Sequence, residues 1–209
     1  MSAVMALTVG AAASGAGADL LRIVRINEQI KRIVGVSCQI NIMALNAIFL
    51  AKRAGSAALG FGVLSNELRV FSHELRNCMQ TLNALIHDCV NEVSVSLRNS
   101  RQGRLLGAVA AGGAAAPLLG RVLQRRAAEG EAQARRLSSL RRQLRRALDD
   151  AFQMVELGGV LAKSAKIEAA YGQSFAPSLA QVSGEFDGIV EEIRSALEAL
   201  RRSPFFTGY

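Results

Sequence analysis

Apolar residues at alternating steps of three and four dominate residues 20–54 of the chain. This spacing is the a/d seam of a coiled coil, because it keeps one face of a helix against its neighbour. The seam is rich in isoleucine at its start and consists of alanine at its end, which predicts a close approach of helices near residue 50. Its members are Ile23, Ile26, Ile30, Ile33, Ser37, Ile40, Ala44, Ala47, Ala51 and Ala54.

A glycine-containing stretch follows this predicted helix. Gly55, Gly60 and Gly62 predict a tight turn over 55–62, since glycine is frequent just past helix C-termini. A second helix follows, and two long helices joined by so short a loop pack as antiparallel neighbours. Its predicted seam consists of Phe61, Leu64, Leu68, Phe71, Leu75, Cys78, Leu82, Leu85 and Cys89.

The same pattern returns after 118 residues. LAKSAKIEAA at 161–170 aligns with MALNAIFLAK at 43–52, and the offset stays constant across a second turn that contains Gly172 and Pro177. We interpret this as an internal duplication, in which two hairpins bury their seams against each other. The second pair of seams comprises Leu144, Leu148, Ala151, Val155, Gly158, Ala162, Ala165 and Ala169, then Leu179, Val182, Phe186, Ile189, Ile193, Ala196 and Leu200.

The predicted fold class is therefore all-α, an antiparallel four-helix bundle or coiled coil made of two helical hairpins in one chain. Residues 1–19 are expected to form an N-terminal Ala/Gly-rich segment, and 20–100 the first hairpin. An Ala/Gly-rich and then Arg-rich connector over 101–134 leads to the second hairpin over 135–203, with its turn at 172–178. Residues 204–209 form a C-terminal tail.

Composition and charge narrow the choice of function. Only 3 Pro and no Trp occur in 209 residues, which argues against a turn-rich β-sandwich or barrel. The formal net charge is +8, and nine arginines lie between Arg121 and Arg146. Such a segment is typical of a surface for nucleic acid or anionic membrane, and equally of the solvated flank of a helix.

Candidate chemistry is sparse. Cys38, Cys78 and Cys89 form no CxxC motif, and His73 and His87 lie apart from them, so we expect neither a disulfide framework nor a metal site. No nucleophile–base pair, Walker loop or dinucleotide fingerprint occurs, which predicts no enzyme and no cofactor.

Membrane and secretion signals are weak. The N-terminal stretch lacks the basic region of a signal peptide, and the apolar stretch 105–120 is shorter than the roughly 20 residues that span a bilayer. Two interpretations of residues 105–120 are retained: a small-residue linker or packed helix, and a segment that dips into a membrane. We expect a cytoplasmic protein with reduced thiols.

Residues 39–69 resemble the signalling tip of bacterial chemoreceptors, the methyl-accepting chemotaxis proteins. The resemblance rests on Q-x-N-x-x-A-L-N-A at 39–47, A-x-R-A-G at 51–55 and Gly-Phe at 60–61, and continues through Asn66, Glu67 and Arg69. In that family, two receptor chains each give one hairpin to a dimeric four-helix bundle. The tip contacts neighbouring receptors, a histidine kinase and a coupling protein, so the resemblance implies such partners here.

The chain departs from the family pattern at an acid–arginine pair. Leu50 stands where the family has an acidic residue, whereas Arg53 is kept. The second copy has the reverse, with Glu168 present and Tyr171 in place of the arginine. We expect Arg53 and Glu168 to face each other across the bundle or across an assembly contact, and the chain to be an altered or inhibitory member.

A second apolar stripe lies outside the seam of the first helix. It consists of Cys38, Ile42, Leu45 and Phe49, whereas the second copy has Glu156, Val160, Lys163 and Ile167 at the matching positions. An uncovered apolar stripe on a bundle marks an interaction site, although additional burial by the N-terminal segment or by helix packing is the competing interpretation. The predicted partner-binding residues are Cys38, Ile42, Leu45, Asn46, Phe49, Leu50, Arg53, Phe61, Val63, Glu67 and Glu168.

Two hypotheses of different classes follow. The first is a soluble chemoreceptor-like adaptor whose hairpin tip binds a chemotaxis histidine kinase, a coupling protein or receptor tips by helix packing, with possible self-association through the tip and recruitment to membrane-associated chemosensory arrays. The second is a basic helical scaffold that binds nucleic acid or anionic membrane through residues 121–146.

Overall fold

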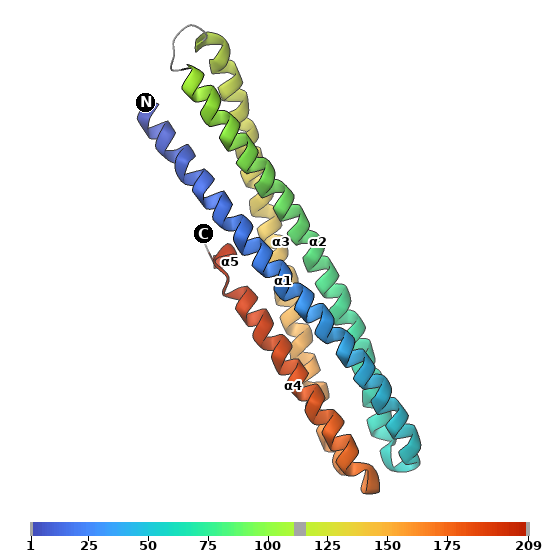
Figure 1. Ribbon diagram of the computed structural model, residues 1–209. Coiled ribbons are helices and arrows are strands. Elements are labelled where there is room, and N and C mark those ends of the chain that lie inside the picture. Colours follow the sequence, from blue (N-terminus) through green and yellow to red (C-terminus); the bar gives the residue numbers. More distant parts are fainter. Residues whose placement is uncertain (1, 111–115, 208–209) are drawn as a thin grey trace. The chain divides into compact units, whose positions relative to one another are not determined.

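The computed structural model consists of long helices joined by short connections (Figure 1). It describes residues 2–110 and 116–207, and for 2–17, 19, 109–110, 116–119 and 206–207 it describes the backbone alone. The four long helices are α1 (Ser2–Ala54), α2 (Leu59–Ala110), α3 (Ala116–Ala170) and α4 (Ala176–Arg201), and the short α5 spans Pro204–Thr207. No strand occurs within these described ranges, so the all-α fold class is confirmed.

The chain divides into two compact units that we describe separately. The turn unit contains residues 27–83 and 145–203 and hence both hairpin turns. The connector unit contains residues 1–26, 84–144 and 204–209. The domain limits given above stay a prediction.

In the turn unit, the predicted seams of α1 and α3 form the core. Every predicted seam residue of α3 is buried, and those of α1 within this unit are buried up to Ala51, with Ala54 half-buried. Large apolar residues also occur off the seams, as at Ile42 and Phe49 of α1 and Ile167 of α3, but these residues are exposed.

The predicted seams of α2 and α4 need a correction. On α2, Leu64, Cys78 and Leu85 are only half-buried, while the residues that follow each of them, Ser65, Met79 and Ile86, are buried. The corresponding shift occurs on α4, where the buried residues Ser183, Val190 and Leu197 take the places predicted for Val182, Ile189 and Ala196. At Ser65 and Ser183 the prediction preferred an apolar neighbour to serine, and at the other positions two apolar residues stand side by side and it chose the wrong one.

Serine can occupy these core positions because its hydroxyl is satisfied within its own helix. The Ser65 hydroxyl donates to the Phe61 carbonyl at 2.7 Å, and that of Ser183 donates to the Ala180 carbonyl at 3.0 Å. A hydrogen-bonded hydroxyl costs far less to bury than a free one. Ser65 and Ser183 are separated by the repeat offset, so the same device is used in both hairpins.

Small residues determine how closely the helices approach near the turns. Ala47, Ala51, Ala165 and Ala169 pack in one buried cluster with Phe61 and Leu179. Further from the turns, a Cβ on Gly158 would come within 2.6 Å of the Phe71 ring. That ring packs edge-on against Phe186 with centroids 6.2 Å apart. The glycine therefore makes room for an aromatic pair between hairpins.

The two turns share one backbone device at equivalent positions. Gly55 opens the first turn with a φ of 63°, and Gln173, 118 residues later, has a φ of 49°. Each of these residues begins a short 3-10 segment, Gly55–Ala58 in the first turn and Gln173–Phe175 in the second. The expected turn glycine, Gly172, has a φ of −72° and packs instead against Leu179.

The connector unit has a smaller and more polar interior. Its buried residues are Ile23, Ile26, Ile86, Cys89, Val93, Gln133, Leu144 and Phe205. The Gln133 amide donates to the Glu92 carbonyl at 3.1 Å and accepts from Asn99 at 3.3 Å, which satisfies a polar group inside the unit. Phe205 of α5 is buried beneath the Arg141 guanidinium, whose carbon lies 4.7 Å from the ring centroid.

One window within Leu20–Ala108 is apolar enough to cross a membrane by length and composition, with a mean hydropathy of 1.8. A third of that window is buried inside the protein. Core helices of bundles pass the same test. The centre of the stretch 105–120, for which membrane contact stayed open, lies outside the described residues.

The turn geometry predicts opposite effects of two substitutions. Gln173→Gly should raise the free energy of unfolding by up to about 1 kcal/mol, because glycine adopts a positive φ without the Cβ clash. Gly55→Ala should lower it by about 1 kcal/mol for the converse reason. Urea unfolding followed by circular dichroism measures both, and a stabilising Gly55→Ala would contradict the turn as described.

Candidate partner-binding surface at the hairpin turns

The predicted apolar stripe of α1 lies on the surface of the turn unit. Ile42 is 59%, Leu45 47% and Phe49 74% exposed, and Cys38 is exposed beside them. Ile42 and Phe49 are seven residues apart and so share the outermost position of the heptad. Burial by the N-terminal segment, the competing interpretation, therefore does not account for these residues.

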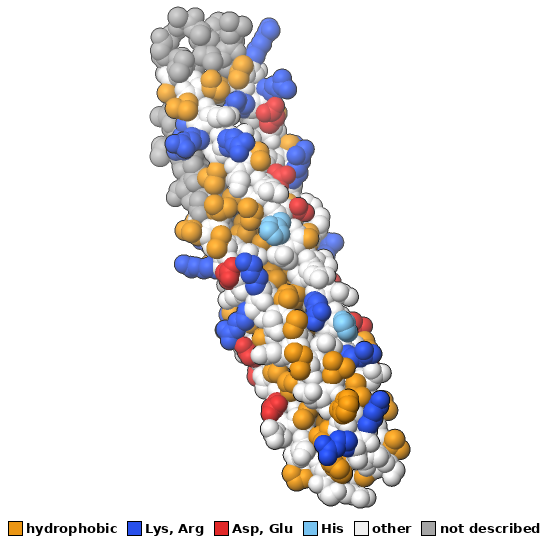
Figure 2. All heavy atoms as spheres, turned by 45° about the vertical axis from the view of Figure 1, so that its right-hand side comes forward, with side chains coloured by type: hydrophobic (Ala, Val, Ile, Leu, Met, Phe, Trp, Pro, Cys, Tyr) orange, Lys and Arg blue, Asp and Glu red, His pale blue; other side chains and the backbone are white. Residues whose placement is uncertain are grey.

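The first turn extends this surface with residues from α2. Val63, a predicted site residue, is exposed, and so is Leu59, which the prediction missed although it lies one helical turn before Val63. Figure 2 shows, on one face of the molecule, hydrophobic side chains lying among charged ones at the end that carries the turns. The exposed apolar residues near the turns thus come from both helices of the first hairpin.

The remaining predicted residues divide between surface and interior. Asn46, Arg53 and Glu67 are exposed, whereas Leu50 is half-buried against the alanine cluster. Phe61 is 1% exposed and belongs to that cluster. It supports the turn from inside and offers no surface to a partner in this structure.

Glu168 is placed against the first turn rather than against Arg53. A Cβ on Gly60 would come within 2.3 Å of the Glu168 carboxylate, so the absence of a side chain at Gly60 leaves room for it. Among the residues that the structure describes, Arg53 and Glu168 form no ion pair with each other. The expectation that they face each other across the bundle is not met, and the assembly contact stays a prediction.

The second hairpin carries a related but more polar face. Val160 and Ile167, the counterparts of Ile42 and Phe49, are exposed. Glu156 forms an ion pair with Arg194 at 3.1 Å, and Lys163 is exposed. The structure adds Leu157 and Tyr171 to the exposed apolar residues of this hairpin, which the comparison of matching positions had not included.

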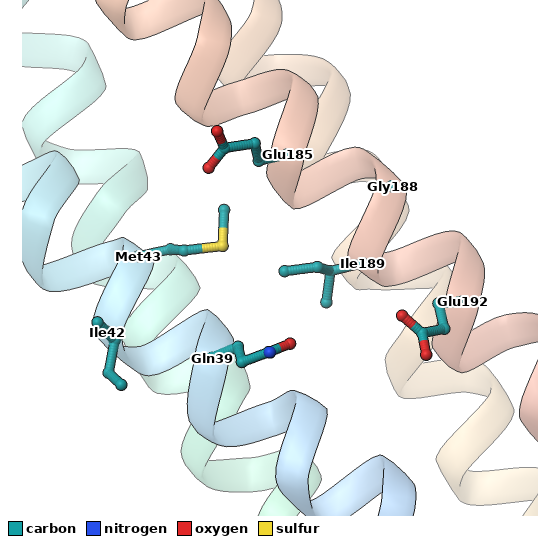
Figure 3. A pocket seen from close by; sticks show the side chains of 7 residues that line it. All are labelled: Gln39, Ile42, Met43, Glu185, Gly188, Ile189 and Glu192. Carbon is teal, nitrogen blue, oxygen red and sulfur yellow. The ribbon is translucent and has the colours of Figure 1, made fainter.

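A groove of about 450 Å³ lies between α1 and α4 of the turn unit (Figure 3). Met43 and Ile189 extend into it from opposite helices, and Gln39 reaches in from α1. Glu185 and Glu192 stand on its α4 side with Gly188 between them, and Ile42 completes the lining. The groove adjoins the apolar stripe through Ile42. Sequence reasoning could not find it, because its walls come from two different repeats.

The two carboxylates of the groove differ in their partners. Arg32 donates to Glu192 at 2.6 Å, which fixes that carboxylate at one end of the groove. Glu185 accepts a hydrogen bond from Gln181 at 3.0 Å, and no lysine or arginine in the described part of the chain pairs with it. The groove therefore presents an apolar floor beside one carboxylate without a counter-ion.

The three thiols occupy different environments. Cys38 is exposed, and the Arg76 guanidinium donates to its sulfur at 3.3 Å. Burial, and secondarily Asp150, raises the pKa of Cys78. Burial raises the pKa of Cys89 to about 11, with Asp88 and Glu92 adding to the effect and Arg141 opposing it. No group of three His, Cys, Asp or Glu side chains within the described residues is placed to hold a metal ion.

The arginine-rich segment 121–146 forms part of α3. Arg125 pairs with Glu129 at 3.1 Å, and Arg126 donates to Gln102 of α2 at 3.0 Å. Arg142 donates to the Ser138 hydroxyl at 2.8 Å. Several of its arginines are thus engaged along or between helices.

Comparison with known proteins settles the family. The model of the methyl-accepting chemotaxis protein signalling domain matches residues 20–128, which is more than half of the chain. The chain belongs to this family. The match covers the whole first hairpin, including the apolar stripe and the first turn. The family is one of signal transducers that act in chemotaxis, and the comparisons do not support the nucleic-acid or membrane hypothesis.

Curated relatives agree with this assignment. The chain is 37% identical over 67 residues to methyl-accepting chemotaxis protein PctB of Pseudomonas aeruginosa, a match of 32% of this chain and 11% of that protein. It is 37% identical over 71 residues to methyl-accepting chemotaxis protein I of Escherichia coli, a match of 34% and 13%. TlpB of Bacillus subtilis is 37% identical over 63 residues, covering 30% and 10%.

These matches span only about a tenth of the length of each relative. No solved structure matches the chain. The family assignment therefore rests on the signalling region alone.

Aspartate substitutions on α1 test whether the stripe residues lie on the surface or in the core. Phe49→Asp should change the free energy of unfolding by less than about 0.5 kcal/mol, because the side chain is largely exposed. Ile40→Asp is the matched control on the same helix, and it should cost more than about 3 kcal/mol because it buries a charge. Urea unfolding measures both, and equal losses would place Phe49 in the core.

Thiol labelling tests the burial of the cysteines. At pH 8 a maleimide should modify Cys38 first and Cys89 only after unfolding, because a buried thiol with a raised pKa stays protonated. Because the thiol of Cys89 ionises at a higher pH in the folded chain than in the unfolded one, the free energy of unfolding should fall as the pH rises from about 9 to about 11. Mass spectrometry of peptides from a time course gives the order, and early labelling of Cys89 would contradict its burial.

Proposed function

We propose that the protein is a chemoreceptor-like signalling adaptor that uses its first hairpin turn to dock on a chemotaxis histidine kinase, a coupling protein or receptor tips. The exposed stripe of Ile42, Leu45 and Phe49 carries this proposal, since it lies in the region that matches the signalling-domain family. Large exposed aromatic and aliphatic groups are the usual anchors of protein–protein contacts.

The internal duplication gives the proposed adaptor two unequal binding faces. One chain supplies two hairpins to the turn unit, so the adaptor presents a single receptor-like face and a second, more polar one. Asn46, Arg53, Val63 and Glu67 surround the stripe and would contribute the polar and apolar rim of the contact. Leu50 takes the place of the acidic residue, so the adaptor would modify or inhibit the array that it joins.

The family resemblance also supports a location. Signalling domains of chemoreceptors lie in the cytoplasm, and we propose the same compartment for this chain, with recruitment to membrane-associated arrays through its partners. Cys38, Cys78 and Cys89 form no disulfide, as is usual for proteins of this compartment.

The proposal predicts co-purification with a chemotaxis histidine kinase and its coupling protein from the same bacterium. The wild-type chain should bind the pair and change the rate of kinase autophosphorylation. Phe49→Asp should weaken binding at least about tenfold, as expected for an anchor residue. Ile167→Asp is the matched control, because it is the repeat counterpart on the more polar face and is similarly exposed.

Salt dependence provides the second readout. Binding through apolar anchors should persist at moderate ionic strength, whereas phosphate contacts weaken steeply with salt. No binding to kinase, coupling protein or receptor tips, together with tight salt-sensitive binding to nucleic acid, would contradict the proposed function.

A further inference from the structure

We propose that one end of the connector unit, formed by the last turns of α2 and the first turns of α3, docks on the surface of an anionic lipid membrane. Arginines of both helices contact the lipid phosphates, and the exposed Leu105 enters the interface beside them. The proposal goes beyond the adaptor function and does not depend on it, because it concerns another unit of the chain and needs no chemosensory partner.

The positive charge of the connector unit is concentrated at this end. The unit holds 12 arginines and 5 acidic residues, and six of the arginines lie within residues 93–128, which contain no aspartate or glutamate. At 1.5 Å per residue, Glu92 lies about 27 Å before the last residue of α2, and Glu129 about 20 Å after the first residue of α3. The end of the unit is therefore cationic, with no carboxylate of these two helices close to it.

Most of these arginines are available to a ligand. Four are exposed and form no ion pair or hydrogen bond within the described part of the chain, namely Arg98, Arg101, Arg104 and Arg121. Arg126 donates to Gln102 at 3.0 Å and so joins α3 to α2 at this level, where the two helices run side by side (Figure 1). The exposed guanidinium groups thus come from two adjacent helices and surround one end of the unit.

Apolar side chains are exposed among these arginines. Leu105 is 65% and Val122 43% exposed, and each directly follows an exposed arginine in the sequence. The 16 residues between Arg104 and Arg121 include no charged residue. Apolar groups next to arginine are typical of a surface that lies in a membrane interface, since the apolar groups enter the lipid while the guanidinium groups reach the phosphates.

The same residues favour lipid over nucleic acid as the anionic ligand. Surfaces that bind nucleic acid are rich in polar groups, and those that bind single strands stack the bases on aromatic side chains. Residues 93–128 contain no Phe, Tyr, Trp or His, and the large side chains exposed among the arginines are aliphatic. Each arginine near an anionic membrane strengthens binding about fivefold, so four of them provide substantial affinity at low salt.

Sedimentation of the full chain with lipid vesicles tests the role of charge. The protein should sediment with vesicles of phosphatidylcholine that contain about one-third phosphatidylglycerol, and should stay in solution with phosphatidylcholine alone. The double variant Arg101→Gln, Arg104→Gln should bind at least about tenfold more weakly.

The matched control is the double variant Arg135→Gln, Arg136→Gln. It makes the same charge change at two exposed arginines of the same unit, which lie roughly 30 Å along α3 from its first residue. That distance exceeds the screening length of about 8 Å at physiological salt, so the control should bind within about twofold of the wild-type chain. Circular dichroism of each variant verifies that helicity is unchanged.

Leu105→Gln separates lipid from nucleic acid without changing the charge. It should weaken binding to anionic vesicles at least about threefold, because the aliphatic side chain no longer enters the interface. Binding of duplex or single-stranded DNA, measured in parallel, should be weaker than vesicle binding at the same salt concentration.

A fluorescent label tests which part of the unit meets the lipid. In a Cys38→Ser background, Gly107→Cys and Gly130→Cys each receive a fluorophore that responds to the polarity of its surroundings. Both glycines are exposed, and a Cβ at either position meets nothing within 4 Å. Anionic vesicles should shift the emission to shorter wavelength at position 107 and leave it unchanged at position 130, which lies about 20 Å along α3 from its first residue.

Four outcomes would overturn the proposal. These are no binding to anionic vesicles at low salt, equal binding to vesicles of phosphatidylcholine alone, equal weakening by the two arginine double variants, or tighter binding to DNA that Leu105→Gln leaves unchanged. None of them would affect the adaptor function, because kinase and coupling-protein binding is measured without lipid.

Discussion

The close approach of helices around the alanine cluster is the contact on which the rest of the turn unit depends. Ala47, Ala51, Ala165 and Ala169 come from the first helix of each hairpin and are all buried together with Phe61 and Leu179. Larger side chains at these positions would push the hairpins apart, since cores tolerate little added volume.

That constraint also explains why the two faces of the turn unit differ. The repeat keeps the buried positions similar but leaves the outer ones free to diverge. The first hairpin retains an apolar stripe at its outermost positions, and the second exchanges half of it for charge. On one side of the unit Gly188 lines the open groove, and on the other the ring of Phe71 packs against Phe186. A symmetric dimer of identical hairpins could not make this distinction, whereas a duplicated chain can.

Much of the fold could be predicted from the sequence, and the exceptions have physical causes. The seams of α1 and α3 were predictable because apolar residues concentrate at a and d positions there. On α2 and α4 two apolar residues stand side by side at several turns, so their order along the seam was ambiguous. At Ser65 and Ser183 a serine with a satisfied hydroxyl takes the core position, which no hydropathy pattern reveals. Gln173 was missed because a positive φ is expected at glycine, and the glycine of the second turn lies one position earlier, at Gly172. The stripe was predictable from spacing, but the groove was not, since it needs the positions of two helices from different repeats.

One chain supplies all four helices of the turn unit, and the ion pair between Arg32 and Glu192 joins its two hairpins. In an Arg32→Lys variant, a carbodiimide should convert this pair into an amide between residues 32 and 192. Because both hairpins belong to one chain, we expect to recover peptides linked at these residues from material of the mass of a single chain, at dilutions where the protein is monomeric. Recovery of the same linked peptides only from material of twice that mass would show instead that the hairpins pair between chains.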